Sequence, residues 1–268
     1  MTEVSLSFGY VKLDNNVGPN TGHDYPVLDA TDASLSGLPI GPGCDATTGL
    51  YAVTFQVLSL WIEDLPDFGS NEVLFKLSGQ TRAGEDPNLR VDTAVDFNFR
   101  VPDRNRASID FALGFTNVLL RNRLVIGLQL IELDKDASAY YKKVKDAISP
   151  ETGRQLIDVL KGVPYLELAT SVADGLIEAF GKNDSDQVWS SNPVFAVRPA
   201  PGAPFLRTGI YVAYENPCDD LPPAALTYRD RRVRLADSAE QAEFKRNFLV
   251  FSLMIEPAPA SVSAKLTS

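Results

Sequence analysis

The sequence predicts a mostly β protein, an antiparallel β-sandwich with one α-helical insertion at about 138–181. Two observations lead to this prediction. Apolar and polar residues alternate along several segments, whereas one internal segment has its apolar residues at helical spacing. Strand-type sequence lies on both sides of that helical segment, which favours one interrupted sandwich over two separate domains. We therefore expect a single domain over 1–256 and an extended C-terminal tail over 257–268.

The clearest alternation runs over 91–101, where the odd positions are apolar or threonine and most even positions are polar. Because successive side chains of a strand point to opposite faces, the odd positions should face the core and the even positions water. The odd positions include Val95, Phe97 and Phe99, and the even ones include Asp96 and Asn98. Comparable patterns predict strands over 4–10, 51–62, 109–115, 124–133, 188–197, 205–214 and 244–255, and a short hairpin over 228–235.

A long stretch over 14–49 is rich in Gly, Pro, Asn and Asp and has no periodic pattern. Loops of this length are uncommon inside a compact domain unless they are functional or packed by their own side chains. This one contains five aliphatic residues that can anchor it against the sandwich: Val27, Leu28, Leu35, Leu38 and Ile40. We therefore expect part of it to be ordered.

The pattern changes to helical spacing after Asp136. Ser149 and Pro150 match a helix N-cap followed by proline in the first turn. A second helix begins near Pro164, has apolar residues at steps of three and four, and ends at Gly181, where glycine suits a helix C-terminus. Residues 138–181 are therefore predicted to form two or three helices.

The charge of the chain bears on its partners. A formal net charge of −10 and a pI of about 4.7 disfavour nonspecific binding to nucleic acid or to anionic membranes. The exception is a basic cluster of Arg229, Arg231, Arg232 and Arg234, which is either a solvated hairpin or a docking patch for an acidic partner. We expect a protein partner or a homo-assembly and no nucleic acid, and a membrane partner is not favoured.

Targeting signals are not evident in the sequence. No basic start followed by an apolar run opens the chain, and no stretch approaches the ~18 apolar residues of a membrane span. This pattern predicts a cytoplasmic protein. Two cysteines, Cys44 and Cys218, do not make a disulfide framework, and the sequence leaves open whether they pair.

Catalytic signatures are missing from the chain. His23, the one histidine, lies in a loop sequence, and no nucleophile elbow, phosphate-binding loop, dinucleotide fingerprint or zinc-protease motif is present. One histidine and two distant cysteines also do not favour zinc. We therefore expect the protein not to be an enzyme.

Acidic residues gather where three predicted strands end or begin. Carboxylates on strand-end loops can converge on calcium, which takes six to eight oxygen ligands. The plainer alternative is that strand ends face water in an acidic protein and carry acids for that reason. The three groups are Glu63, Asp64 and Asp67, then Glu132, Asp134 and Asp136, and finally Asp184 and Asp186.

Two of these groups lie in a context that resembles C2 domains, the calcium- and phospholipid-binding sandwiches of synaptotagmins and protein kinase C. Residues 58–73 (LSLWIEDLPDFGSNEV) are similar to the first strand and loop of that family, and residues 124–136 (LVIGLQLIELDKD) to the strand that enters its third loop. The resemblance implies a helical insertion in that third loop and calcium ligands at Asp64, Asp67, Asp134, Asp136 and Asp186.

The departures from the family limit what carries over. The usual Asp-Pro-Tyr after the first loop is replaced by residues 71–73 (NEV), and no polybasic strand is present. We therefore predict a non-enzymatic β-sandwich interaction or structural module with calcium at its loop end. The alternatives are a peripheral lipid- or membrane-binding domain and a carboxylate-dependent hydrolase effector.

Overall fold

The computed structural model describes residues 6–12, 33–39, 50–65, 70–82, 90–110, 113–121, 123–133, 187–197, 204–229, 231–236 and 244–258. The predicted helical insertion at 138–181 lies outside them, as do most of the 14–49 stretch, Cys44 and the tail after residue 258. The described part is mostly β, as predicted, with fourteen strands and one short 3-10 helix, η2 (Pro223–Ala225).

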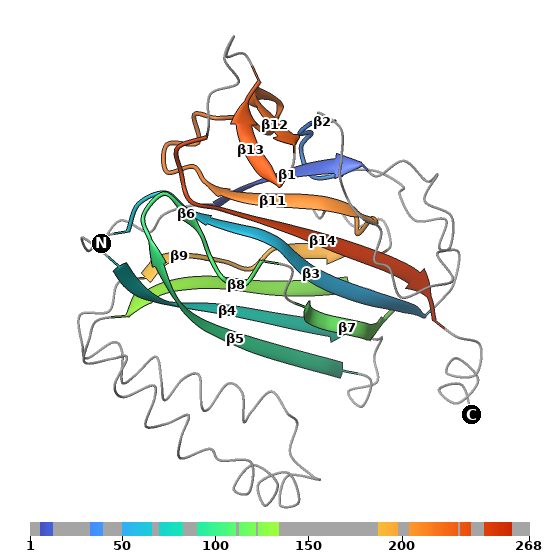
Figure 1. Cartoon of the computed structure of the whole chain (residues 1–268). Helices are drawn as coiled ribbons and strands as arrows, with labels where there is room; N and C mark the ends of the chain where they lie inside the picture. Colours follow the sequence, from blue (N-terminus) through green and yellow to red (C-terminus); the bar gives the residue numbers. More distant parts are fainter. Residues whose placement is uncertain are drawn as a thin grey trace, which may run out of the picture.

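The fourteen strands form three sheets whose strand pairs are all antiparallel (Figure 1). The six-stranded sheet contains, in order, β1 (Leu6–Lys12), β11 (Gly209–Glu215), β14 (Phe248–Pro257) and β3 (Tyr51–Ile62), and β3 also pairs with β6 (Asn105–Arg106) and β7 (Leu113–Leu120). The five-stranded sheet runs β10 (Val194–Ala196), β8 (Arg123–Leu133), β4 (Ser70–Arg82) and β5 (Arg90–Pro102), with β9 (Gln187–Ser191) also on β8. The three-stranded sheet is β13 (Arg232–Leu235), β12 (Leu226–Arg229) and β2 (Ala33–Ser34).

The six-stranded sheet is the middle layer, because both of its faces are covered (Figure 1). On β11, Tyr211 and Ala213 pack into the main core shared with the five-stranded sheet, whereas Val212 and Tyr214 pack into a second core under the three-stranded sheet. This double burial explains why β11 is apolar at successive positions, as strands buried on both faces generally are.

Aromatic rings pack against each other in the main core, both within the six-stranded sheet and between the two large sheets. The Phe251 ring stacks on Phe55 of β3 and on Tyr211 of β11, with ring centroids 4.7 and 5.4 Å apart. Phe195 of β10 meets Tyr211 edge-on at 5.3 Å and so connects the two large sheets. The Phe251 stacks thus join neighbouring strands within the six-stranded sheet, and the Phe195–Tyr211 contact joins the two layers.

β3 contains a β-bulge at the place where its sequence changes from alternating to apolar on both faces. Val57 and Leu60 both face the main core, while Leu58 between them packs into the second core. On β14, Val250 pairs with Ser59 and Phe251 with Val57, so Leu58 is the extra residue. The bulge inverts the phase of the strand, and both faces of β3 are buried here because the six-stranded sheet is the middle layer.

A carboxylate completes the backbone pairing at this bulge. The Leu60 N–H donates to Asp110 Oδ1 at 2.8 Å, and the Leu60 carbonyl accepts from the Ala107 N–H at 2.9 Å. Burial raises the pKa of Asp110, while the Leu60 N–H, Arg106, Ser59 and Arg231 act in the opposite direction. A buried backbone donor rarely lacks a partner, and here a side chain from the β6–β7 connection supplies it.

Most predicted strands are present, with shifted ends. The 109–115 prediction is wrong at its start, because residues 108–110 form a turn and β7 begins at Leu113, although Ile109 is buried. The segments predicted at 205–214 and 244–255 become strands only at Gly209 and Phe248, and the 188–197 segment divides into β9 and β10. The hairpin predicted over 228–235 is confirmed as β12 and β13.

The alternation over 91–101 is confirmed where β5 side chains are described. Phe99 is buried, Val95 and Phe97 are half-buried, and Asp96 and Asn98 are exposed. The apolar face therefore points inward as expected. Its partial exposure has a physical cause, since among the described strands β5 is the last of its sheet.

The expected partial order of the long 14–49 stretch is confirmed for 33–39. Leu35 is 2% exposed and packs into the second core, and Ser36 exchanges two backbone hydrogen bonds with Tyr10 of β1. Within the described ranges, no helix has the length and apolar character needed to cross a bilayer.

Candidate functional site

A polar network occupies one end of the six-stranded sheet. β1 and β14 begin there and β3 and β11 end there, because neighbouring strands are antiparallel. The register places Leu6 opposite Glu215, Tyr214 opposite Phe248, and Phe248 opposite Trp61. Polar residues directly before or after these strands therefore meet, although they are far apart in sequence.

Asn247, just before β14, is the centre of the network and is only 3% exposed. Its Oδ1 accepts from the backbone N–H of Glu63 at 2.6 Å and of Asp64 at 3.3 Å. Its Nδ2 donates to the Asp64 carbonyl at 3.0 Å and to Glu215 Oε1 at 2.7 Å. One buried amide thus fixes the chain after β3 and joins it to the end of β11.

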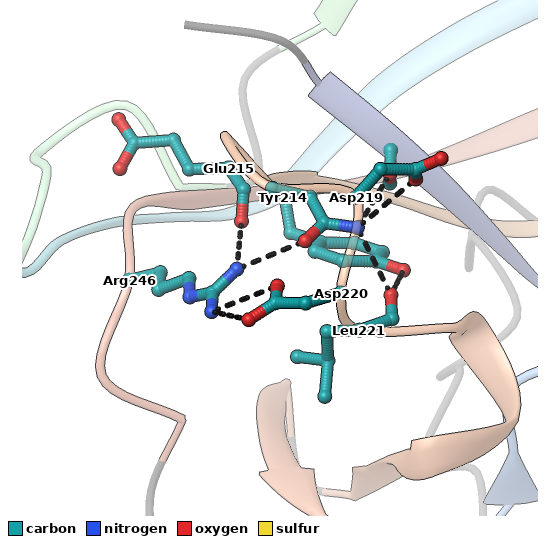
Figure 2. A network of polar contacts seen from close by, with 8 residues as sticks. Tyr214, Glu215, Asp219, Asp220, Leu221 and Arg246 are labelled. Atoms are coloured by element: carbon teal, nitrogen blue, oxygen red, sulfur yellow. Dashed lines mark hydrogen bonds and ion pairs between the residues drawn. The ribbon is translucent and has the colours of Figure 1, made fainter.

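Arg246 connects the same strand ends to the loop after β11 (Figure 2). Its Nη1 donates to the Glu215 carbonyl at 3.2 Å and to Asn216 Oδ1 at 3.0 Å. Its Nη2 reaches Asp220 Oδ1 at 3.3 Å. In Figure 2 the Glu215 carboxylate points away from the guanidinium. The main-chain oxygen of Glu215 points towards it.

Asn216 and Tyr214 fold the 216–221 loop back onto the sheet. Asn216 Nδ2 donates to Ser7 Oγ at 3.0 Å and to the Leu221 carbonyl at 3.1 Å. The fully buried Tyr214 donates its hydroxyl proton to the same carbonyl at 2.8 Å. The loop that carries the exposed residues Cys218, Asp219 and Asp220 is therefore held by its ends.

Burial controls the electrostatics of Glu215. It raises the pKa of this carboxyl above the usual 4.5, and the hydrogen bonds from Asn247 and the charge of Arg246 lower the pKa again. The nearby Asp64 adds a smaller upward effect because two negative charges repel each other. Burial therefore makes Glu215 easier to protonate than an ordinary exposed glutamate, and Asp64 is its exposed neighbour.

Of the five predicted calcium ligands, the structure places Asp64 alone, exposed and directly after Glu63 at the end of β3. Asp67, Asp134, Asp136 and Asp186 lie outside the described residues. Within the described ranges, no group of three or more His, Cys, Asp or Glu side chains is arranged to hold a metal ion. Cys218 is a free, exposed thiol.

The strand ends next to those four positions do gather at one end of the molecule. Leu133, the last residue of β8, pairs with Glu72 near the start of β4, and Ile131 pairs with Gln187, the first residue of β9. β3 ends and β4 begins at this same end (Figure 1). The segments that contain all five aspartates therefore leave or enter the sheets from one side.

Several residues of the network escaped the sequence analysis: Glu215, Asn216, Arg246 and Asn247. The available signal was the position of Asn216 and Asn247, each just outside an apolar strand. Since β11 and β14 pair antiparallel, the end of one meets the start of the other, but this pairing is not visible in the sequence.

Comparisons of the chain with protein-family models, with curated proteins and with solved structures find no match. The resemblance to C2 domains accordingly stays a prediction.

Proposed function

We propose that the protein is a non-enzymatic interaction or structural module, and that a second copy of the chain adds to its five-stranded sheet at β5. The single observation that carries this proposal is the edge formed by β5. Among the strands that the structure describes, this 13-residue strand pairs with β4 alone, through thirteen consecutive residue pairs. A long edge strand offers unpaired backbone groups to another chain.

Other edges of the two large sheets are shorter or already engaged. β10, at the opposite edge of the five-stranded sheet, has three residues, and β1 is bridged at Tyr10 by Ser36. Short or covered edge strands resist further pairing. β5 is therefore the edge best suited to accept a strand.

The side chains of β5 favour a second copy as the occupant. Antiparallel pairing of two β5 strands about their midpoint sets Val95 of one copy opposite Phe97 of the other and Asp92 opposite Arg100, each twice by symmetry. Asp96 meets its own copy in this register, and this one like-charge pair opposes the four favourable ones. Val95 and Phe97 are both half-buried in one chain, so a second copy would cover apolar surface that now contacts water. Pairs of an aromatic and a β-branched residue are among the stabilising cross-strand contacts.

Two matched substitutions test the proposal. Val95→Lys places a charge on the inward face of β5, whereas Val194→Lys makes the same change on β10, where Val194 is already 37% exposed. Sedimentation velocity should give the wild type and Val194→Lys twice the 29.2 kDa mass of one chain, and Val95→Lys the mass of one chain.

A monomeric wild type, or a dimer that survives in a folded Val95→Lys variant, would contradict the proposal. If Val95→Lys fails to fold, the exposed pair Asp96→Lys and Asn98→Lys provides the same test, because lysines on an edge strand oppose strand addition without entering the core.

Calcium binding at the loop end is a second candidate function. The observation that favours it is the convergence of strand ends, since the end of β8 and the starts of β4 and β9 are paired neighbours. Asp64, Asp67, Asp134, Asp136 and Asp186 all follow or precede these strands closely in sequence. Oxygen ligands from separate loops at one end of a sheet suit calcium, which tolerates irregular geometry.

A further inference from the structure

Asp96 is the central residue of the β5 edge. β5 has 13 residues, and Asp96 is the seventh, so two copies that pair about their midpoint place Asp96 directly opposite itself. Side chains directly opposite on antiparallel strands have their Cβ atoms about 4.5–5.5 Å apart. The pairing proposed above therefore brings two carboxyl groups together at the centre of the interface.

The described charges that face Asp96 come from one neighbouring strand. Lys76 of β4 is directly opposite Asp96, and the register continues from Lys76 to the neutral Gln129 on β8. β7, which also packs against β5, contains no titratable residue. β6 carries Arg106, which lies beyond the Pro102 end of β5. Lys76 is therefore the cation of the described neighbouring strands that faces Asp96.

The surroundings of Asp96 already favour its protonated form in a single chain. The residue is exposed, yet desolvation by the atoms around its carboxyl raises the pKa above the usual 3.8, and the charge of Lys76 lowers it again. A second copy of β5 would remove more water from this carboxyl and place a like charge beside it. Both effects raise the pKa of a carboxyl group further.

Lys76 does not cancel the repulsion that pairing introduces. It faces Asp96 of its own chain in the monomer and in the dimer alike, so this attraction is unchanged on pairing. Its attraction to Asp96 of the other copy acts across two strand spacings, about 9–10 Å, where salt screens it. The two carboxylates are about half as far apart, so their repulsion is the larger change.

The remaining charged residues of this interface titrate at lower pH. Asp92 of one copy is opposite Arg100 of the other in the proposed register, and a neighbouring cation lowers the pKa of a carboxyl group. Arg100 also donates to Glu72 of β4 through its Nε, at 2.7 Å from Glu72 Oε1. The Asp96 pair should therefore take up a proton before Asp92 does.

We propose that pH regulates assembly at β5 through one proton shared by the two Asp96 carboxyl groups, so that the dimer becomes tighter as the pH falls. This inference rests on the proposed pairing at β5. The protonated carboxyl of one copy donates to the carboxylate of the other, and a charge-assisted hydrogen bond thereby replaces the repulsion. At neutral pH the same two charges oppose strand addition, as charged side chains on natural edge strands do.

The direction of the effect follows from proton binding. Between the pKa of Asp96 in one chain and the higher pKa of the shared proton, the dimer binds one proton more than two separate chains do. The association constant therefore rises by up to about tenfold for each pH unit in this interval as the pH falls. The rise ends at the pKa of Asp96 in the single chain.

The test measures the dimer dissociation constant of the full chain by sedimentation velocity, over a concentration series at several pH values. The lowest pH stays above the pI of about 4.7, so that the chain keeps a net negative charge. The wild type should bind about fivefold or more tightly near pH 5.5 than near pH 7.5. Asp96→Asn should dimerise more tightly than the wild type near pH 7.5 and change by less than about twofold with pH, because asparagine cannot ionise.

Glu256→Gln is the matched control, since it removes one exposed carboxylate from β14 in the other large sheet and should keep the pH dependence of the wild type. If Asp96→Asn fails to fold, Asp96→Ala gives the same comparison. A wild-type dissociation constant that does not change with pH, or an equal change in Asp96→Asn, would overturn this inference and leave the pairing at β5 standing. Wild type and Asp96→Asn that are both monomeric at every pH would instead contradict the pairing itself.

Discussion

The side-chain amide of Asn247 hydrogen-bonds both main-chain polar groups of Asp64, a residue 183 positions away in sequence. The amide oxygen accepts from the Asp64 N–H, and the amide nitrogen donates to the Asp64 carbonyl. Because the same amide also binds Glu63 and Glu215, the loop after β3 and the ends of β11 and β14 form one unit. The position of Asp64, the one predicted calcium ligand that the structure places, therefore depends on Asn247.

Replacing Asn247 should destabilise the protein strongly. Asn247→Ala removes four hydrogen bonds and leaves part-buried backbone groups of Glu63 and Asp64 without these bonds, so we expect a loss of about 2–4 kcal/mol in the free energy of unfolding. Asn105→Ala is the control, since Asn105 is exposed and its side chain accepts one local bond from the Arg106 N–H. Urea unfolding measures both. A loss for Asn247→Ala as small as that for Asn105→Ala would contradict the role of Asn247 as the centre of the network.

Glu215 should make stability depend on pH in a defined direction. Because burial raises its pKa in the folded chain above the usual 4.5, the folded state binds this proton more tightly than the unfolded state. The free energy of unfolding therefore falls as the pH rises from 4.5 through the folded-state pKa. Well below pH 4.5 the carboxyl is protonated in both states, so Glu215 adds no further pH dependence there.

Glu215→Gln isolates this effect, since glutamine keeps an acceptor for Asn247 Nδ2 and cannot ionise. Its stability relative to the wild type should rise with pH over that interval. Urea unfolding of both proteins across the acid range measures the difference. Parallel stability curves for the two proteins would show that ionisation of Glu215 does not lower the free energy of unfolding, and would contradict this prediction.

The two rings of one aromatic pair should differ in how much they contribute to the free energy of unfolding. The rings of Phe75 on β4 and Phe97 on β5 stack with centroids 6.0 Å apart, but Phe75 is fully buried and Phe97 is half-buried at the edge. Phe75→Ala should cost about 3–5 kcal/mol. Phe97→Ala should cost less, about 1–3 kcal/mol. Thermal or urea unfolding at a concentration where the chain is monomeric tests the order, and equal losses would contradict the position of β5 at the edge.

The calcium candidate predicts a metal-dependent melting temperature. A ligand that binds the folded state alone adds about 2.7 kcal/mol at a hundredfold excess over its dissociation constant. The melting temperature should rise with calcium, rise much less with magnesium, and lose this response in Asp134→Asn/Asp136→Asn. A wild type that melts identically with and without calcium would refute the candidate site at Asp64, Asp67, Asp134, Asp136 and Asp186.

The sequence predicts the strands better than their partners. The alternation over 91–101 and the apolar run over 51–62 locate β5 and β3 almost to the residue, because burial of one or both faces leaves a direct pattern. The apolar runs of β3 and β11 indicate that both faces of each strand are buried, but they do not show the register shift at Leu58 or which segments cover each face, since those depend on contacts between distant segments.

The candidate site shows the same limit. Asp64 can be predicted because acidic residues at a strand end are visible in the sequence. Asn247 cannot, because it acts through hydrogen bonds to residues more than a hundred positions away. Arg246 likewise looks like an ordinary charged residue before β14 until the loop after β11 folds against it. Long-range polar pairing therefore needs the structure.

The central claim, that a second copy pairs with β5, is tested most directly by amide hydrogen exchange at two protein concentrations. In a dimer joined at this edge, amides along 90–102 that point away from β4 should be protected at high concentration and should lose protection on dilution, because the inter-chain hydrogen bonds then dissociate. Amides of β8 in the sheet interior should remain protected at both concentrations. Exchange along β5 that does not change with concentration, whether fast or slow, would contradict the claim.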